Sequence, residues 1–179
     1  MKQRKMAKSV KTDLNRYLKE LSREELEKEI KKLYTKFNEI KKYYEMELSH
    51  DTTAILNEYK LKIKQEYFPK RGYGKARNKE SRKVVANFKK ISIYPKDVIE
   101  LLLYRVEMMI AFTNAYGDID EPFYNSLESS FEEACKLIQH ERLVDEYTIT
   151  CHQLIDQTHD FGWGLYEGLK YSYDRYLNY

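Results

Sequence analysis

The sequence predicts an all-α protein, and three features of its 179 residues support that prediction. Glycine and proline are rare, with 6 and 3 residues, which leaves few positions for the turns of an all-β fold. Apolar residues recur at the three- and four-residue spacing of amphipathic helices. The segment Pro95–Tyr116 is apolar on nearly every side, as expected of a helix that other helices surround. We expect about eight helices in a bundle or a short stack of helical hairpins, around a central buried helix near residues 96–116.

The N-terminal residues predict a basic arm followed by two helices. Residues 1–11 are basic but lack the apolar run of an export signal, so we expect a loose, flexible arm. A helix follows over about 12–20. Ser22 stands three residues before Glu25, the spacing of a capping box, so a second helix begins there and continues to about Tyr44. The apolar stripes of the two helices comprise Leu14, Tyr17, Leu18, Leu21, Leu26, Ile30, Leu33, Tyr34, Phe37, Ile40 and Tyr44.

The middle of the chain predicts two helices separated by an irregular basic segment. The first helix begins near Thr53 and ends before Pro69. The second covers about 79–90, and the segment 69–78 between them contains two glycines. The side chains expected to point inward are Leu56, Tyr59, Ile63, Tyr67, Val84, Val85 and Phe88.

The C-terminal half predicts the central helix and three more. Gly117 ends the central helix, because glycine adopts the left-handed conformation of a C′ position at no steric cost. Asp120 caps the next helix, with Pro122 in its first turn. Another helix covers about 143–158, and a break at 161–164 precedes the last one. Their inward residues are expected to be Phe123, Leu127, Phe131, Ala134, Cys135, Ile138, Tyr147, Cys151, Leu154, Ile155, Leu165, Leu169, Tyr173 and Leu177.

Charge is distributed unevenly along what we expect to be a single domain over residues 1–179. Residues 1–90 carry 26 Lys and Arg against 13 Asp and Glu, a net charge of +13, and residues 91–179 carry 6 against 16, a net charge of −10. This polarity has three interpretations: a nucleic-acid partner, a homo-oligomer held by the opposite halves of different copies, or two solvated faces of one fold.

Compartment follows from the apolar runs and the cysteines. The central apolar run is shorter than the roughly 18 residues of a membrane span, so we expect no membrane association. Cys135 and Cys151 lie on apolar stripes, which predicts buried reduced thiols. A cytoplasmic protein fits these features.

Three segments of the chain resemble a bacterial family known only as a domain of unknown function. They are FPKRGYGKAR at 68–77, FTNAYGDIDEPFY at 112–124 and GWG at 162–164. The resemblance extends over most of the chain, including KTDLNRYLKELSREEL near the start. It implies a cytoplasmic helical protein and brings no activity, cofactor or catalytic residue.

The basic segment 70–90 is the first candidate site, since nine Lys and Arg there face only Glu80. A glycine-bearing loop before a helix can hold a phosphate on its backbone N–H groups, and Tyr73 could stack on a base. It is not a Walker loop, because Ala76 stands where Ser or Thr would bind magnesium. The alternative is a solvated loop, or one neutralised by the acidic half. The candidate residues are Lys70, Arg71, Tyr73, Lys75, Arg77, Arg82 and Lys83.

Two groups of acidic and histidine side chains are candidate metal ligands. Asp118 and Asp120 lie in an acidic turn, although capping of the next helix explains the turn equally. His152, Asp156 and His159 would share one face of a continuous helix and are ligand types for zinc or iron. The alternative is a polar helix face.

Polar and aromatic side chains supply the remaining candidates. Glu107 lies on a seam with Glu100 and Asn114 along the central helix, so we expect it to be buried with a perturbed pKa, paired to another helix or lining a cleft. Trp163, Tyr166 and Tyr173 form a candidate protein interface. Alternatively, they close the end of the bundle.

These patterns favour a non-enzymatic, cytoplasmic helical binding or adaptor protein that engages a protein partner and needs no cofactor. One alternative is a protein that binds nucleic acid or phosphate through the loop 70–83. Another is a metal-dependent enzyme that uses a cleft near Glu107, Asp118 and His152.

Overall fold

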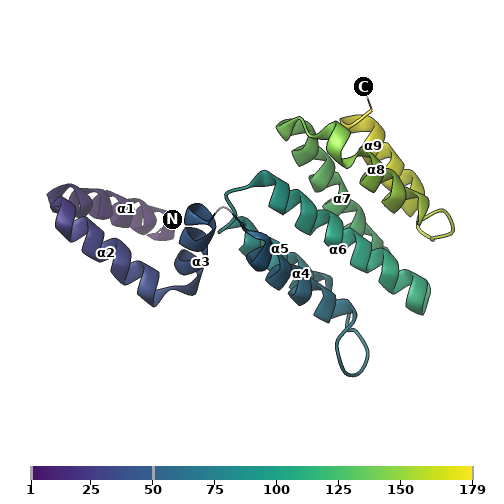
Figure 1. Cartoon of the computed structure of the whole chain (residues 1–179), viewed down its shortest axis with the longest axis horizontal. Coiled ribbons are helices and arrows are strands. Elements are labelled where there is room, and N and C mark those ends of the chain that lie inside the picture. Colours follow the sequence, from purple (N-terminus) through teal and green to yellow (C-terminus); the bar gives the residue numbers. More distant parts are fainter. Residues whose placement is uncertain (1, 50, 179) are drawn as a thin grey trace. The chain divides into compact units, whose positions relative to one another are not determined.

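The computed structural model describes the backbone of residues 2–49 and 51–178, and the side chains of residues 10–49 and 51–178. Within these residues the chain forms nine α-helices and no strand (Figure 1). The all-α prediction is confirmed. No helix in the described part combines the length and the apolar character that crossing a membrane requires.

The chain divides into two compact units, residues 1–44 and 45–179, where the sequence predicted one domain. Unit 1 contains α1 (Lys2–Glu20), α2 (Arg23–Lys36) and the start of α3 (Asn38–Leu48). The end of α3 belongs to unit 2, because Met46 is fully buried there. The other helices of unit 2 are α4 (Thr53–Tyr67), α5 (Asn78–Lys89), α6 (Pro95–Tyr116), α7 (Glu121–Glu141), α8 (Val144–Asp156) and α9 (Leu165–Tyr176).

Unit 1 differs from the expectation at two places. Helix α1 begins at Lys2, so the segment expected to be a loose arm is helical; it contains no glycine or proline to stop a helix. The second predicted helix is divided at Phe37, whose extended backbone (φ −121°, ψ 118°) ends α2. Phe37 and Asn38 have lower helix propensity than the lysines, glutamates and leucines before them.

The capping box at the start of α2 is confirmed. The Ser22 hydroxyl accepts the N–H of Glu25 at 3.3 Å, and the Glu25 carboxylate accepts the N–H of Ser22 at 2.8 Å. The box fixes where α2 begins, but it buries nothing. Among residues 10–44 no side chain is buried.

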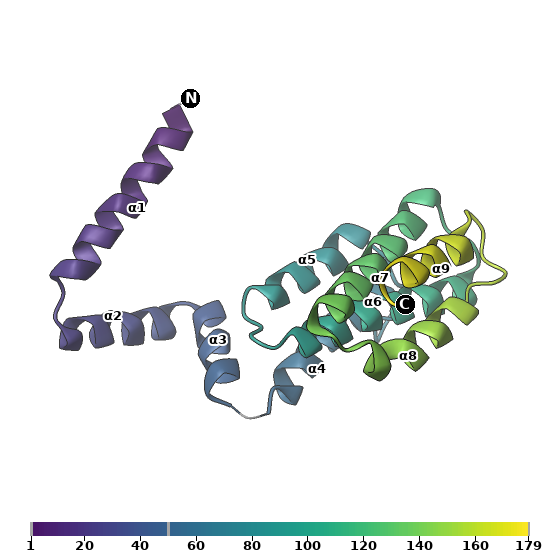
Figure 2. The ribbon, with the colours of Figure 1, turned by 90° about the horizontal axis from the view of Figure 1, so that it is seen from above.

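Unit 2 consists of three successive antiparallel helix pairs, α4 with α5, α6 with α7 and α8 with α9 (Figures 1 and 2). Helix α6 packs against α4, α5, α7 and α8, and α7 also packs against α9. The predicted central helix is therefore confirmed, with Pro95 at its start, ten buried residues and Gly117 at φ +84° after its end.

The predicted inward residues of unit 2 are almost all buried. Val84 is the exception and is half-buried. The Asp120 carboxylate accepts the N–H of Phe123 at 2.8 Å, which confirms the predicted cap of α7. Cys135 and Cys151 are buried and form no disulfide, as predicted.

Candidate functional site

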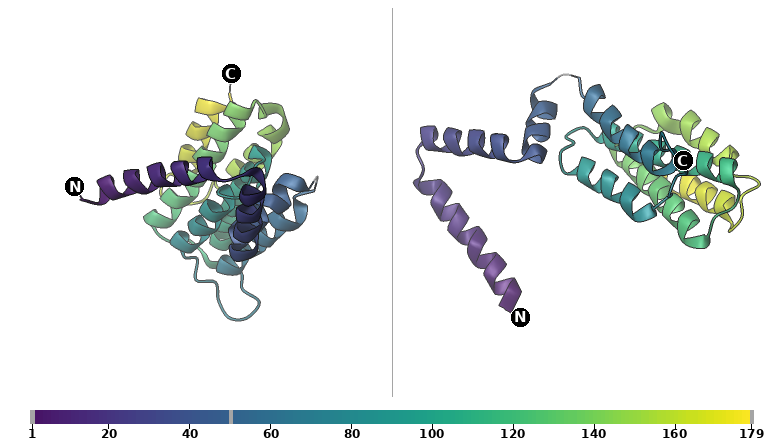
Figure 3. Two further views of the ribbon diagram at one scale, coloured as in Figure 1. Left: turned by 90° about the vertical axis from the view of Figure 1, so that its left-hand side faces the viewer. Right: turned by 90° about the horizontal axis from the view of Figure 1, so that it is seen from below.

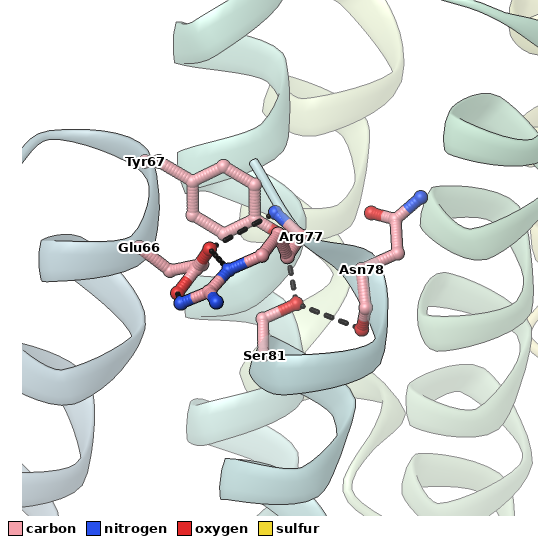
Figure 4. A network of polar contacts seen from close by, with 5 residues as sticks. All are labelled: Glu66, Tyr67, Arg77, Asn78 and Ser81. Carbon is pink, nitrogen blue, oxygen red and sulfur yellow. Dashed lines mark hydrogen bonds and ion pairs between the residues drawn. The ribbon is translucent and has the colours of Figure 1, made fainter. Parts of the chain in front are cut away.

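The loop between α4 and α5, residues 68–77, is held in one shape by Glu66. The backbone carbonyl of Glu66 accepts the N–H groups of Lys75 and Ala76, each at 3.1 Å. Its carboxylate accepts the N–H of Arg77 at 3.1 Å and the Arg77 guanidinium at 2.8 and 3.1 Å (Figure 4). These bonds from Arg77 hold the pKa of Glu66 below its ordinary value. A loop that projects from the end of unit 2 (Figure 3, left) is thereby fixed at its base.

Glycine is required inside this loop. A Cβ on Gly74 would lie 1.8 Å from the carbonyl oxygen of Tyr67, so the loop packs against the end of α4 only because Gly74 has no side chain. Gly72 has φ +76°, a left-handed conformation that costs other residues energy, but open space surrounds it. The two glycines therefore serve different purposes, close approach and backbone conformation.

The predicted phosphate cradle is corrected by these contacts. The backbone N–H groups of Lys75, Ala76 and Arg77 point to the carbonyl and carboxylate of Glu66. Glu66 therefore already occupies these three N–H groups, two with its backbone carbonyl and one with its carboxylate. The sequence argument missed it because Glu66 lies in the preceding helix, about ten residues away.

Seven cationic side chains on the loop and on α5 are exposed, and we call them the basic surface. They are Lys70, Arg71 and Lys75 of the loop, and Lys79, Arg82, Lys83 and Lys90 of the α5 segment. The last four recur at helical spacing and share one side of the helix. Within the described part of the chain none of the seven forms an ion pair, whereas the neighbouring Arg77 and Lys89 pair with Glu66 and Glu133.

Tyr73 extends this surface with an aromatic ring. Its side chain is 84% exposed, and its ring lies beside that of Tyr116 at the end of α6, with ring centroids 6.4 Å apart. Tyr116 in turn packs on Phe112, at 4.6 Å between centroids. The exposed ring is thus connected to the aromatic core of unit 2 through the end of the central helix.

The acidic turn serves structure. The Asp118 carboxylate accepts the hydroxyl of Tyr124 at 2.6 Å and the N–H of Gly162 at 3.4 Å, which ties the turn before α7 to the loop before α9. Asp120 is occupied as the cap of α7. The capping alternative explains Asp120, and Asp118 is a tether between loops.

The histidines lie apart from that turn. The His152 ring lies against Tyr173, with centroids 4.4 Å apart, and the His159 ring stacks on Tyr166 at 4.0 Å. Asp156 is exposed at the end of α8. The described residues contain no group of three His, Cys, Asp or Glu side chains placed to hold a metal ion. The structure therefore does not bring the five candidate ligands together.

Glu107 is not buried, which corrects the prediction for the central helix. Glu107, Glu100 and Asn114 lie on the solvent side of α6. Glu107 and Glu100 line a groove of about 490 Å³ between α4, α6 and α8, together with Glu146 of α8. Asp118 and His152 are not among its lining residues, so the residues of the proposed enzyme cleft are separated.

Three carboxylates and the Lys60 side chain line this groove. Burial, followed by the nearby carboxylates of Glu100 and Glu146, raises the pKa of Tyr147 to about 12. Burial and then Glu107 likewise raise the pKa of Tyr104. Two of the three groove carboxylates have cationic partners, because Glu100 pairs with Lys60 at 3.0 Å and Glu146 with Lys96 at 2.7 Å.

The buried charge of α6 is Arg105, which sequence reasoning missed. Its side chain is fully buried and donates to the hydroxyls of Ser81 at 2.9 Å and Ser126 at 2.7 Å, to the carbonyl of Ser126 at 3.0 Å, and to the hydroxyl of Ser130. Burial lowers the pKa of Arg105. The sequence feature that could have predicted this burial is the position of Arg105, one turn after Leu101 and one turn before Met109 on an otherwise apolar stripe.

The three aromatic interface candidates differ in their exposure. Trp163 is 62% exposed, so its ring is available for contact. Its backbone adopts φ +62°. Tyr166 is half-buried beneath the ring of His159. Tyr173 is buried in the core, which favours the alternative that it closes the end of the helices.

The loops before α5, α7 and α9 lie at the same end of unit 2 (Figure 1). The segments 68–77, 112–124 and 162–164, on which the resemblance was based, all fall at this end. The fold and the basic surface together define an all-helical protein with a cationic loop and helix at one end of its helix pairs. The chain belongs to the family of unknown function DUF6155, which matches residues 9–176. No curated protein and no solved structure matches the chain.

Proposed function

We propose that the protein is a non-enzymatic binding protein whose basic surface engages single-stranded nucleic acid. The observation that carries this proposal is the set of seven exposed cations without ion pairs on the loop 68–77 and one side of α5. Lys and Arg side chains that neutralise phosphates release counterions, and this release drives binding that is independent of sequence.

The contacts of Glu66 favour an extended polyanion over a single bound phosphate. The three N–H groups just before α5, those of Lys75, Ala76 and Arg77, are already bonded to Glu66. What remains are long side chains spread along a helix, which span about 17 Å between Lys79 and Lys90 at 1.5 Å per residue. This geometry suits a phosphate backbone that passes along the helix.

Tyr73 favours a single strand over a duplex. An exposed aromatic ring beside cations offers a stacking surface to an unpaired base, and every base has a face that can stack. The ring stands on a loop whose shape Glu66 and Gly74 fix before any ligand arrives. Such preorganisation lowers the entropy lost on binding.

The test is a fluorescence-anisotropy titration of labelled single-stranded RNA and DNA across a series of salt concentrations. We expect binding that weakens as salt rises. Arg82→Ala with Lys83→Ala removes two phosphate contacts and should reduce the slope of log K against log salt by about 1.4. Tyr73→Ala should weaken binding by about 1–3 kcal/mol with the slope unchanged.

The matched control is Arg142→Asn with Lys170→Ala, which removes the same charge from two exposed positions outside the basic surface. Asparagine suits position 142 because Arg142 has φ +59°. The control should bind as the wild type does. Absence of binding at low salt, or equal losses in both double variants, would contradict the proposal.

A protein partner is the second candidate, because most of the surface that lines a groove of about 450 Å³ is apolar. It lies between the α5–α6 connection, α6 and α7, and includes Ile93, Val98 and Leu137. Lys89, Glu133, Lys136 and His140 are also among its lining residues. An adaptor role predicts a partner that is captured by the wild type and by the Arg82→Ala, Lys83→Ala variant but lost with Leu137→Lys. A partner retained by Leu137→Lys would exclude this groove.

A further inference from the structure

A groove of about 350 Å³ lies between α5 and α7, and we call it the Ser130 groove. Its polar and charged lining residues are Arg82, Lys89, Ser129, Ser130 and Glu133. Arg82 is exposed and forms no ion pair within the described part of the chain, whereas Lys89 of α5 pairs with Glu133 of α7. Because Lys89 and Glu133 balance one another, Arg82 leaves the groove with a positive charge.

The buried guanidinium of Arg105 lies behind this groove. It donates to the hydroxyl of Ser130, a residue that lines the groove although it is only 5% exposed. Leu102 also lines the groove and precedes Arg105 by one turn of α6. Burial lowers the pKa of Arg105, and among the charges of the groove Arg82 lowers this pKa further whereas Glu133 raises it. The buried charge and the charges of the groove therefore act on one another.

The charge of Arg105 is not balanced by its hydrogen-bond partners. They are hydroxyl and carbonyl oxygens of Ser81, Ser126 and Ser130, which are neutral. Inside a protein such a charge is screened less than in water, so it attracts an anion at the neighbouring surface. The Ser130 hydroxyl accepts from Arg105, and its own hydrogen can therefore be donated to that anion.

We infer that the Ser130 groove binds a phosphate group, with Arg82 and the Ser130 hydroxyl as donors and the charge of Arg105 behind them. Phosphate has several acceptor oxygens, and an arginine side chain can donate to two of them at once. The Glu133 carboxylate opposes this binding, because it repels an anion and pairs with Lys89. Removal of that carboxylate should therefore strengthen binding, which makes the inference testable by a gain as well as by a loss.

The experiment is a titration of the isotope-labelled full chain with inorganic phosphate, followed by the backbone amide resonances, with sodium chloride added to keep the ionic strength constant. The amides of Ser129 and Ser130 should shift and saturate. Arg82→Gln should raise the Kd by about two- to fivefold, because it removes a charge that faces the anion. Glu133→Gln should lower the Kd by a similar factor. Both positions are exposed, so both variants should fold as the wild type does.

The matched controls are Lys170→Gln and Glu167→Gln, which change the same charges at exposed positions of α9 outside the groove. Both should leave the Kd for inorganic phosphate unchanged. The inference is overturned if the shifts do not saturate or are confined to the loop 68–77. It is also overturned if Arg82→Gln and Glu133→Gln have the same Kd as their controls.

The phosphate is either a free anion or one group of a nucleic-acid backbone, and the chemistry of the site is the same for both. Anisotropy titrations with labelled single-stranded RNA distinguish these sources. A strand that places a phosphate in the groove should bind more tightly to Glu133→Gln than to Glu167→Gln, whereas equal strand affinities assign the site to a free phosphate. Arg82 also belongs to the basic surface, but the inference does not require that a strand binds. Failure of the strand to bind would contradict the proposed function, and only the titration with inorganic phosphate can overturn the inference.

Discussion

At the scale of single residues, Arg105 is the least expected feature of the protein. A buried charge normally has an opposite charge beside it, but this guanidinium donates hydrogen bonds to the hydroxyl and carbonyl oxygens of serines. The Ser81 hydroxyl donates to the carbonyl of Asn78 at 3.2 Å, so the Tyr67 hydroxyl, 2.8 Å away, donates to Ser81 (Figure 4). The guanidinium of α6 is thereby hydrogen-bonded to serine oxygens on α5 and α7, and Tyr67 of α4 donates to one of these serines.

Arg105→Lys tests whether this network stabilises the fold. An ammonium keeps the charge but has three donors at one point and cannot reach Ser81 and Ser130 on different helices together. Because the buried oxygens would then lose their donors, we expect the free energy of unfolding to fall by about 2–4 kcal/mol. Urea unfolding followed by circular dichroism measures this. Arg82→Lys, at an exposed position of α5, should leave the midpoint unchanged; equal midpoints for both variants would show that the donor geometry is unimportant.

At the scale of elements, loops of unit 2 depend on contacts made by single residues in neighbouring elements. Glu66 fixes the loop before α5 from the end of α4. Asp118 fixes the loop before α9, and a Cβ on Gly162 would lie 2.8 Å from its Oδ2. The end of unit 2 that carries Tyr73 and Trp163 is therefore formed by loops that are held by hydrogen bonds to neighbouring elements.

Gly74→Ala is expected to be more damaging than Gly72→Ala. The added methyl group at position 74 meets the backbone of Tyr67 at 1.8 Å, so the loop must move and break its bonds to Glu66. We expect a loss of about 2–4 kcal/mol at position 74, against about 1–2 kcal/mol at position 72, where only the positive φ is unfavourable. Urea midpoints of the two variants give the comparison, and limited proteolysis would show cleavage in the loop of the first. Equal losses would mean that the close approach does not matter.

At the scale of the whole molecule, the two units differ in what holds them. Every buried hydrophobic residue described lies between Met46 and Leu177, so the described core belongs to unit 2 alone. Unit 1 contributes helices with caps and surface ion pairs, which stabilise a folded protein only slightly. The net charge of the two units differs as well. Residues 1–44 carry 14 Lys and Arg against 7 Asp and Glu, a net charge of +7, whereas the whole chain carries +3.

A chain that begins at Asn38 should therefore fold as unit 2 does in the full protein. It retains all of α3 and every buried residue. We expect its free energy of unfolding to lie within about 1 kcal/mol of the full-length value, and its helix signal to fall by the share of α1 and α2. Urea unfolding of both chains is the measurement. An unfolded or strongly destabilised shorter chain would show that unit 1 supports the core.

The sequence by itself determined those features that depend on neighbours in the chain. The apolar stripes of α4 and α7, the box at Ser22, the cap at Asp120 and the end of α6 at Gly117 follow from residue types three or four positions apart, and all were predicted correctly. Such features involve one turn of helix or one reversal, so local chemistry suffices to specify them.

Only the tertiary structure decided which charge of α6 is buried and what the loop before α5 can bind. Glu107 and Arg105 are two residues apart, and their exposure depends on where α5 and α7 place serine oxygens. The N–H groups of Lys75, Ala76 and Arg77 are already bonded to Glu66 of the preceding helix. The basic side chains remain exposed because the acidic residues of the C-terminal half pair elsewhere or face another groove. Each outcome depends on contacts between segments far apart in the chain, which periodicity and spacing do not encode.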